Sequence, residues 1–375
     1  MADPHLPEDA VIEILIRLPV KSIVKLRCVS KTWRDLIKSP TFIHRHQNRE
    51  RKQSVLLVKR YLTQQNGDEA ILSFHDPDSP ELLVSPNLSI PFSNDLDHPS
   101  ANYALVQIYG PCNGIVCIPV GDIILLCNPA LREFMPLPPP NIPRPEGYFV
   151  YHLEFGFGFD PNTGAYKVMQ ISQTTTKDFQ LLPDQDRFDL YDSASNSWKH
   201  IDAKRPIMIT CFPSFQIFFG GVLHFYAEID MNDDPYILCF DITTEAFQLL
   251  DFPDDFPEYG LSSLTVLNEN LAMVGYPRWK GESEPSQIIE IWVMKEYGVK
   301  ESWTKQFVIG PYMVFCPFLL LNNEWLLVES NNVGQLAVCG LHENNFKELQ
   351  FYGFGSTISA AVVYQESLIS LNDII

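Results

Sequence analysis

Apolar residues follow two different patterns along the chain, and the change falls near residue 53. Up to that point they recur at helical spacing, in short segments interrupted by proline and serine. From about Ser54 onward they form short runs separated by Gly, Pro, Asn and Asp. These periods predict a small all-α domain over residues 1–52 and an all-β domain over residues 53–375.

Proline and serine mark the ends of the expected helices. Pro7 suits the first turn of one helix, and Pro19 ends it. Ser30 can cap a later helix, and Ser39-Pro40 repeats the start signal. The three or four expected helices cover residues 7–18, 21–26, 31–37 and the stretch from Pro40 through His46.

The first of these helices is apolar around most of its circumference. Its apolar residues are Val11, Ile12, Ile14, Leu15, Ile16 and Leu18. A helix of this kind needs burial on two sides, and so short a domain cannot enclose every such side chain by itself. The surplus should meet a partner or the next domain, where each large side chain contributes roughly 1.5–3 kcal/mol when buried.

A short repeat recurs through the β-rich part of the chain: a hydrophobic run, an Asp or Asn, and a large apolar residue six positions later. The pairs are Asp76 with Leu82, Asn128 with Phe134, Asp160 with Tyr166, Asp192 with Trp198 and Asp241 with Phe247, and variants of the unit end at Trp303 and Phe346. The Asx side chain can accept hydrogen bonds from backbone amides of the turn. The repeat therefore predicts a series of β-hairpins whose returning strands carry bulky anchors.

Glycine-led strands precede several of these hairpins, as in Gly114–Cys117 and Gly221–Phe225, giving units of about four strands. Such units, repeating at roughly 40–50 residues, are typical of a β-propeller. Six blades are expected, with five to seven left open, and the strand-like tail Ser359–Tyr364 would close the ring by joining the first blade. The expected blades cover residues 55–85, 106–140, 155–203, 216–253, 263–309 and 315–350.

Charge divides at the same place. Residues 1–52 hold 11 Lys or Arg and 6 Asp or Glu, and the remainder holds 16 and 40, within a net charge of −19. The two parts present opposite fields, which favours two different partners, although an acidic surface also serves the solubility of a large β-domain. Nucleic-acid binding by the acidic part is disfavoured, because phosphate contacts need Lys and Arg.

The eight cysteines are interpreted as reduced thiols of the core. None forms a Cys-x-x-Cys pair and most lie inside apolar runs, which argues against disulfides and zinc. No apolar run reaches the roughly 18 residues of a membrane helix, and residues 1–7 lack the pattern of a signal peptide. The expected location is the cytoplasm, with the nucleus as an alternative, and neither a cofactor, a metal nor a membrane is expected.

The sequence lacks the common local motifs of catalytic sites. There is no Gly-x-x-x-x-Gly-Lys, His-Glu-x-x-His or Gly-x-Ser-x-Gly pattern. The acidic cluster of Asp230, Asp233 and Asp234 is interpreted as a solvated turn and His224 as a core or strand-edge residue. Although propellers host enzymes, no nucleophile is paired with a base here, and the chain is expected to be non-catalytic.

The N-terminal residues resemble the plant F-box. The matching segments are Leu6-Pro7-Glu8-Asp9, Ile14 through Ser22, and Arg27-Cys28-Val29-Ser30-Lys31-Thr32-Trp33. The resemblance implies docking onto a Skp1-like adaptor, which links to a cullin and a RING subunit, and the positive charge of the module suits an acidic adaptor. The residues it assigns to adaptor binding, directly or in support, are Leu6, Pro7, Ile14, Leu18, Pro19, Val24, Leu26, Val29, Ser30, Lys31, Trp33 and Leu36. For Val11, Leu15 and Ile37 the alternative, packing in the module's own core, is expected.

The β-rich part resembles the plant F-box-associated, kelch-like domain from about residue 106 to 310. The segments that carry this likeness are Gly156–Pro161 with Tyr166-Lys167-Val168, Leu190-Tyr191-Asp192 with Trp198, and Ile291–Gly298 with Ser302-Trp303. The overall texture, including Ile108–Gly114 and Asn128–Arg132, is most similar to S-locus F-box and S-locus F-box-like proteins. That similarity implies a role in pollen, where the family recognises pistil ribonucleases in self-incompatibility.

Together these resemblances imply a substrate-recognition subunit of an SCF-type (Skp1-cullin-F-box) E3 ubiquitin ligase, which recruits a target protein for ubiquitination and degradation. The target is expected to be basic, with S-ribonucleases as one candidate, and an immune receptor or a metabolic enzyme as alternatives. A sugar-binding or enzymatic kelch-type propeller is the alternative from another class. The loops expected to touch the target are 136–145, 228–235 and 252–259.

Overall fold

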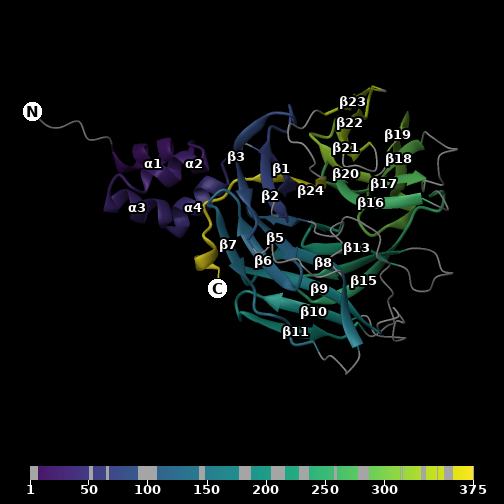
Figure 1. Ribbon diagram of the computed structural model, residues 1–375, viewed down its shortest axis with the longest axis horizontal. Helices are drawn as coiled ribbons and strands as arrows, with labels where there is room; N and C mark the ends of the chain where they lie inside the picture. Colours follow the sequence, from purple (N-terminus) through teal and green to yellow (C-terminus); the bar gives the residue numbers. More distant parts are fainter. Residues whose placement is uncertain are drawn as a thin grey trace, which may run out of the picture.

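The helices and the strands form two bodies that lie side by side (Figure 1). The structure, a computed structural model, describes residues 7–49, 54–64, 67–91, 108–142, 148–176, 187–203, 216–227, 236–256, 260–277, 287–312, 314, 316–330, 335–343, 345–349 and 358–374. Four helices are followed by six four-stranded sheets, which are the blades of a propeller. The predicted fold class is confirmed.

The helices begin where the capping signals predict. They are α1 (Glu8–Ile16), α2 (Val20–Leu26), α3 (Lys31–Lys38) and α4 (Pro40–Gln47). The Ser30 hydroxyl accepts a hydrogen bond from the Trp33 backbone N–H at 3.1 Å, and Ser39 accepts one from Phe42 at 3.3 Å. Pro7 was expected at the first helical position of α1. It is instead the N-cap residue, one position earlier, because its backbone is extended and not helical.

Each blade is an antiparallel sheet, and the hydrogen bonding follows chain order except in the first blade. Blade 1 consists of β24 (Ile358–Gln365), β1 (Ser54–Gln64), β2 (Gly67–His75) and β3 (Leu83–Ser89). Blade 2 consists of β4 (Tyr109–Cys112), β5 (Ile115–Val120), β6 (Ile123–Asn128) and β7 (Glu133–Pro136). Blade 3 consists of β8 (Tyr148–Asp160), β9 (Ala165–Thr176), β10 (Arg187–Asp192) and β11 (Ser197–Ile201).

The remaining three blades repeat this order. Blade 4 consists of β12 (Ile217–Phe219), β13 (Val222–Ala227), β14 (Tyr236–Asp241) and β15 (Ala246–Asp251). Blade 5 consists of β16 (Gly260–Leu267), β17 (Asn270–Pro277), β18 (Gln287–Met294) and β19 (Trp303–Tyr312). Blade 6 consists of β20 (Cys316–Leu321), β21 (Trp325–Glu329), β22 (Leu336–Gly340) and β23 (Phe346–Glu348).

The ring closes through β24, which pairs with β1 as the sequence predicts, in a register that sets Val55 opposite Tyr364. The first strands of the blades contact one another in ring order, from β24 through β4, β8, β12, β16 and β20 back to β24. All six blade interfaces hold an apolar cluster of buried side chains. Closure thus hides the inner strand edges, and the interfaces supply the stabilising apolar burial.

The predicted turn chemistry is present in the structure. The side-chain Oδ1 atoms of Asp76, Asn128, Asp160, Asp192 and Asp241 each accept a hydrogen bond from the backbone N–H two residues later. These bonds satisfy amides that the tight reversals leave unpaired.

One detail of the predicted repeat is wrong, the anchor at Leu82, and the strands that each turn joins were not predicted. Asp160 lies between the first and second strands of its blade, whereas the other four Asx residues lie between the third and fourth. Leu82 is 57% exposed and anchors nothing. It stays in a long turn, because β3 begins only at Leu83 and its pairing with β2 is irregular.

The helices rest on one end of the propeller. Ala130 and Leu131, in the turn between β6 and β7, pack against the apolar cluster of the helices, and the Gln47 side chain reaches the Asn113 carbonyl between β4 and β5. Because successive strands run in opposite directions, the connections after β7, β13 and β15 leave from the other end. The loops expected to touch the target are these three connections; residues 143–145, 228–235 and 257–259 lie outside the described residues.

Buried histidines make the fold sensitive to acid. Burial lowers the pKa of His75 and of His224 to about 4. The unfolded chain binds a proton at each histidine below about pH 6.5, whereas the folded chain does so only below about pH 4. The free energy of unfolding therefore falls as the pH drops from about 6.5 to about 4, by up to about 1.4 kcal/mol per pH unit for each group.

Glu154 contributes a pH dependence of the opposite sign to the free energy of unfolding. Burial raises its pKa to about 7, against the hydrogen bonds it accepts from the Tyr109 hydroxyl at 2.6 Å and the Phe155 amide at 3.0 Å. Between about pH 4.5 and pH 7 the folded chain holds a proton that the unfolded chain has released, so acidification through this range stabilises the fold.

Glu154→Gln removes that gain, and in urea titrations we expect its stability to fall more steeply than the wild type's between pH 7 and about pH 4.5. Glu324→Gln, on an exposed turn, is the control; an unchanged pH profile in Glu154→Gln contradicts the assignment.

Candidate docking surface on the helices

The helices enclose a small apolar core. Its buried members are Leu15, Ile16, Val20, Ile23, Ile37, Phe42 and, from the far end of the sequence, Leu368. Two of the three residues assigned to the module's own core, Leu15 and Ile37, are 2% and 0% exposed, and Val11 packs against them partly buried. All four helices thus contribute to the core, and α1 supplies Leu15 and Ile16 as its buried members.

None of the predicted adaptor-binding residues that the structure describes is buried. Pro7, Ile14, Pro19, Val29, Ser30 and Lys31 are exposed, and Leu18, Val24, Leu26, Trp33 and Leu36 are partly buried; Leu6 lies outside the described residues. Ile14 is 51% exposed and Val29 is 62% exposed. Covering large apolar side chains by a partner removes them from water and lowers the free energy of the complex. These helices therefore present an apolar surface suited to docking.

The partly buried members give this surface its rigidity. Trp33 and Leu18 pack against the core of the helices while part of each side chain stays accessible. The Leu18 carbonyl accepts hydrogen bonds from His46 Nε2 at 3.0 Å and from Arg49 Nη1 at 2.6 Å, which ties the link between α1 and α2 to the end of α4. Burial lowers the pKa of His46, so the neutral imidazole is favoured there.

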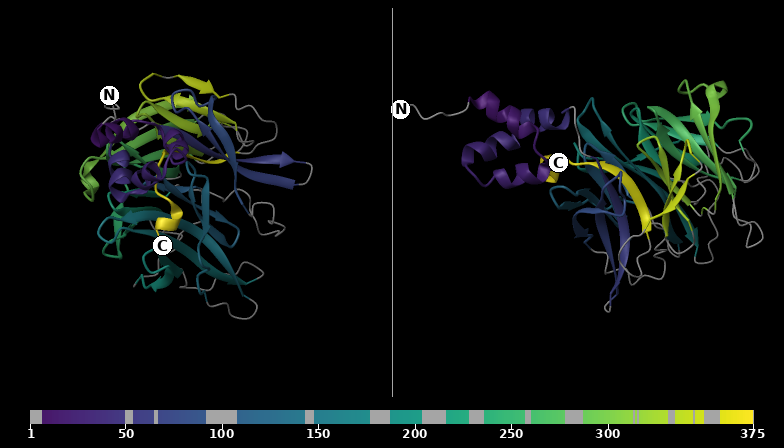
Figure 2. Two further views of the ribbon diagram at one scale, coloured as in Figure 1. Left: turned by 90° about the vertical axis from the view of Figure 1, so that its left-hand side faces the viewer. Right: turned by 90° about the horizontal axis from the view of Figure 1, so that it is seen from above.

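The propeller leaves this surface open. Figure 1 shows α1 and α3 on the side of the helices that points away from the blades, and in Figure 2 the helices project from the ring instead of lying within it. The blades therefore do not sheathe the helices, and an incoming protein has access to α1 and α3.

The junction between the helices and the propeller was missed by sequence reasoning. Burial lowers the pKa of Arg27, and the nearby carboxylates of Glu133 and Asp373 oppose that shift; Glu366 has the same effect on Arg49. Part of the positive charge of residues 1–52 therefore faces acidic groups of the same chain, not only a partner. The charge division was the one available signal, but it could not identify partners so distant in the sequence.

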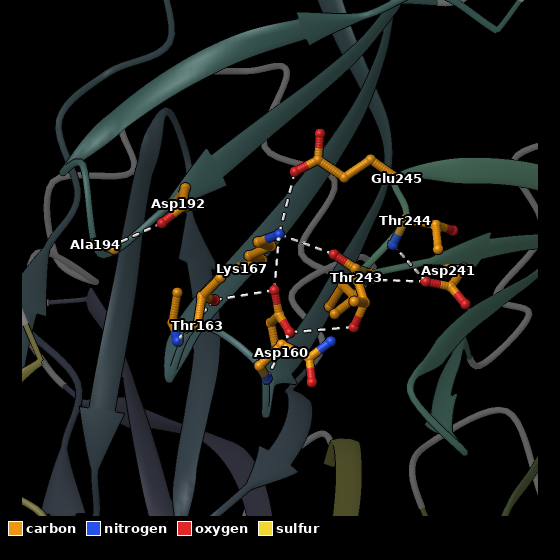
Figure 3. A network of polar contacts seen from close by, with 12 residues as sticks. Asp160, Thr163, Lys167, Asp192, Ala194, Asp241, Thr243, Thr244 and Glu245 are labelled. Carbon is orange, nitrogen blue, oxygen red and sulfur yellow. Dashed lines mark hydrogen bonds and ion pairs between the residues drawn. The ribbon is translucent and has the colours of Figure 1, made fainter.

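A buried charge network lies between blades 3 and 4 (Figure 3). Lys167 Nζ donates to the Ile242 carbonyl at 2.8 Å and to Glu245 Oε1 at 3.1 Å, and lies 3.3 Å from Asp160 Oδ2. Burial acts to lower the pKa of Lys167, but Glu245 and Asp160 outweigh it and raise the pKa. The network fastens two blades together, since its Asp160 also accepts a hydrogen bond from Thr243 of blade 4 at 3.1 Å.

The part of the chain that the structure describes offers little other candidate chemistry. In that part of the chain no group of three or more His, Cys, Asp and Glu side chains is placed to hold a metal ion, and no helix is long and apolar enough to cross a membrane. The Asp230 cluster lies outside it. Six cysteines are described there as free thiols, of which Cys28 is exposed, unlike the core position expected of it, because it follows the end of α2. Buried His224 lies within a strand and contacts Tyr297 at 2.9 Å.

The fold thus consists of a small helical module with an open apolar surface, joined to a six-bladed propeller. The sequence matches the F-box domain over residues 4–45 and the F-box associated beta propeller domain over residues 79–371. The chain belongs to this family of F-box proteins with an associated β-propeller. F-box proteins are generally non-catalytic substrate adaptors, and the F-box implies Skp1 binding within an SCF complex.

The relatives agree with this assignment. F-box protein CPR1 of Arabidopsis thaliana is 26% identical over 81% of this chain and 73% of its own length. F-box protein At5g65850 of the same plant is 27% identical over 89% of this chain and 79% of its own. Neither name refers to the S-locus. Among solved structures, a nidogen/laminin complex contains a chain similar over 84% of this chain and 99% of its own, with 12% identity and a TM-score of 0.44.

Proposed function

We propose that this chain is the substrate-recognition subunit of an SCF-type E3 ubiquitin ligase and has no catalytic activity of its own. The helices dock onto a Skp1-type adaptor, which links the chain to a cullin and a RING subunit, and the propeller holds a target protein for ubiquitination and degradation. The observation that carries the proposal is the exposure of Ile14 on α1 and of Val29 between α2 and α3, beside a buried helical core that does not include them.

The target we propose is a basic protein. The part of the chain beyond residue 52 holds 40 acidic and 16 basic residues, and such a field attracts and orients a positively charged partner. Basic pistil S-ribonucleases are one candidate, supported by the likeness of 108–114 and 128–132 to S-locus F-box proteins. An immune receptor or a metabolic enzyme is the alternative.

The face that we propose for the target is the end of the propeller opposite the helices. The helices already occupy the end that carries Asn113 and Leu131. The other end carries the described beginnings of the predicted loops, Leu137–Ile142 and Phe252–Phe256, together with the acidic residues Asp122 and Asp202. Binding there would leave the docking surface free.

Two binding measurements on the full chain test the proposal. A Skp1-type adaptor should be retained by the immobilised chain, whereas a free-standing sugar-binding or enzymatic propeller would retain none. For the target we expect the affinity of a basic ribonuclease to fall about tenfold or more between about 0.05 and about 0.5 M salt, because screening shortens the reach of surface charge. Adaptor binding through apolar side chains should change less. An affinity for the ribonuclease that is insensitive to salt contradicts electrostatic recognition.

A further inference from the structure

The segment that follows β24, Glu366–Ile374, lies between the helices and the propeller and contacts both. We call this segment the strut. In Figures 1 and 2 its yellow ribbon runs between the purple helices and the blades, and it ends in the short 3-10 helix Leu371–Asp373. The strut is far from the helices in sequence, so its contacts with them come from the tertiary fold.

Alternate parts of the strut reach into the helices. Leu368 is 1% exposed and belongs to the apolar core of the helices. Burial raises the pKa of Glu366, and the Val20 backbone N–H at the start of α2, Arg49 and Lys21 oppose the shift. An acidic group at the N-terminus of a helix is stabilised by the helix dipole. The strut therefore contributes a buried apolar side chain, Leu368, and an acidic side chain, Glu366, to the helical module.

The rest of the strut is held by blade 2. Asn128 Nδ2 donates to the carbonyl oxygens of Ser367 at 3.2 Å and Ile369 at 2.7 Å. Glu133 Oε2 accepts hydrogen bonds from the Ser370 hydroxyl at 3.0 Å and from the Leu371 amide at 2.8 Å. The Leu371 side chain is 2% exposed in the apolar cluster between blades 2 and 3.

Gly114 lets the strut approach this closely. A Cβ at this position would lie 2.3 Å from the Ser367 Cβ and 2.8 Å from the Gln365 carbonyl oxygen, and the φ of Gly114 is +75°. A side chain there would both strain the turn and push the strut away. Gly114 therefore allows close contact between the strut and the propeller, and Leu368 anchors the strut in the core of the helices.

We infer that the strut holds the helices in one orientation relative to the blades, with Leu368 and Gly114 as positioning residues. The chain passes from α4 to β1 once, and bodies joined by one connection are free to move relative to each other by default. Beside the contacts of Ala130, Leu131 and Gln47, the strut adds a tie that enters the core of the helices and resists rotation about the α4–β1 connection. The consequence, that the distance between ligase and target is set by the strut, rests on the proposed function; the orientation itself does not.

Distances between two nitroxide labels on the full chain test the strut. Suitable positions are Lys38→Cys on α3 and Val308→Cys on β19, both exposed, in a chain whose reactive native cysteines are replaced by serine. We expect Leu368→Ala to broaden the distance distribution and Leu368→Met, which preserves the volume, to retain the wild-type maximum. A wild-type distribution in Leu368→Ala overturns the inference.

Gly114→Ala provides a second test, because it acts on the strut from blade 2 without shortening any side chain in the core of the helices. Helical content measured by circular dichroism shows whether the helices of Leu368→Ala remain folded. If they do not, Gly114→Ala decides, and a wild-type distance distribution in that variant overturns the inference. The two proposals fail separately. A wild-type chain that binds no adaptor removes the proposed function, whereas the distance distributions report on the strut in either case.

Discussion

Replacing Ile14 and Val29 together with aspartate is expected to abolish binding of a Skp1-type adaptor while the four helices stay folded. Both side chains are more than half exposed in the free chain, so their loss costs the isolated fold little. In the complex each would contribute about 1.5–3 kcal/mol, and the loss of about 3 kcal/mol or more corresponds to at least about 100-fold in affinity. Titration calorimetry measures the affinity, and circular dichroism measures the helical content.

The chain offers a matched control for this experiment. Leu83 on β3 is 53% exposed, and Leu83→Asp makes the same kind of change on the propeller. We expect this variant to bind the adaptor with wild-type affinity. Undiminished binding in the Ile14→Asp, Val29→Asp chain would show that the adaptor docks elsewhere.

Replacing Lys167 with methionine is expected to destabilise the propeller by about 3–5 kcal/mol, the usual cost of leaving a buried charge without its partner. The Asp160 side chain, 2% exposed and 3.3 Å from the lysine, would remain charged beside an apolar group. Its hydrogen bonds from Thr163 and Thr243 would still be made, but they do not replace the cation. Urea unfolding followed by tryptophan fluorescence measures the loss.

Lys199 belongs to the same network and serves as the control. It pairs with Glu245 but is 49% exposed, so Lys199→Met should cost about 1 kcal/mol or less. Adding Asp160→Asn to Lys167→Met should recover part of the stability, because the unpaired charge is then removed. Equal losses in Lys167→Met and Lys199→Met would contradict the importance of the buried pair.

Local signals explain how much of the fold was predictable. A serine cap such as Ser30 or Ser39 needs only the backbone of its own first turn, and Asn128 or Asp241 needs only the amides of the next few residues. Hydrogen bonds of this kind depend on only a few consecutive residues. The four helices, the six blades and the closing strand could therefore be predicted.

The candidate surface was predictable only through resemblance to the F-box. Because α1 is apolar around most of its circumference, periodicity alone does not separate Ile14, which is 51% exposed, from Leu15, which is 2% exposed. That distinction depends on which side of α1 faces the rest of the helical core, including Leu368. A tertiary contact between residues so far apart in sequence has no local pattern.

The same reason explains the errors and omissions. The ion pair of Lys167 with Glu245 joins residues 78 positions apart, and no feature of either segment indicates that the two side chains meet. The spacing rule also treated all Asx turns alike, so it could not tell that Asp160 precedes the second strand of its blade while Asp192 precedes the fourth. Spacing identifies turns, whereas strand order is fixed by the packing of whole blades.

The heat capacity of adaptor binding tests the central claim most directly, since that claim concerns apolar surface. The intact chain would be titrated with a Skp1-type adaptor at several temperatures. We predict an equimolar complex whose enthalpy becomes more negative as the temperature rises, because removal of apolar surface from water gives a negative heat-capacity change. No binding, or binding with a heat-capacity change near zero, would mean that the uncovered side chains of the helices are not a docking surface.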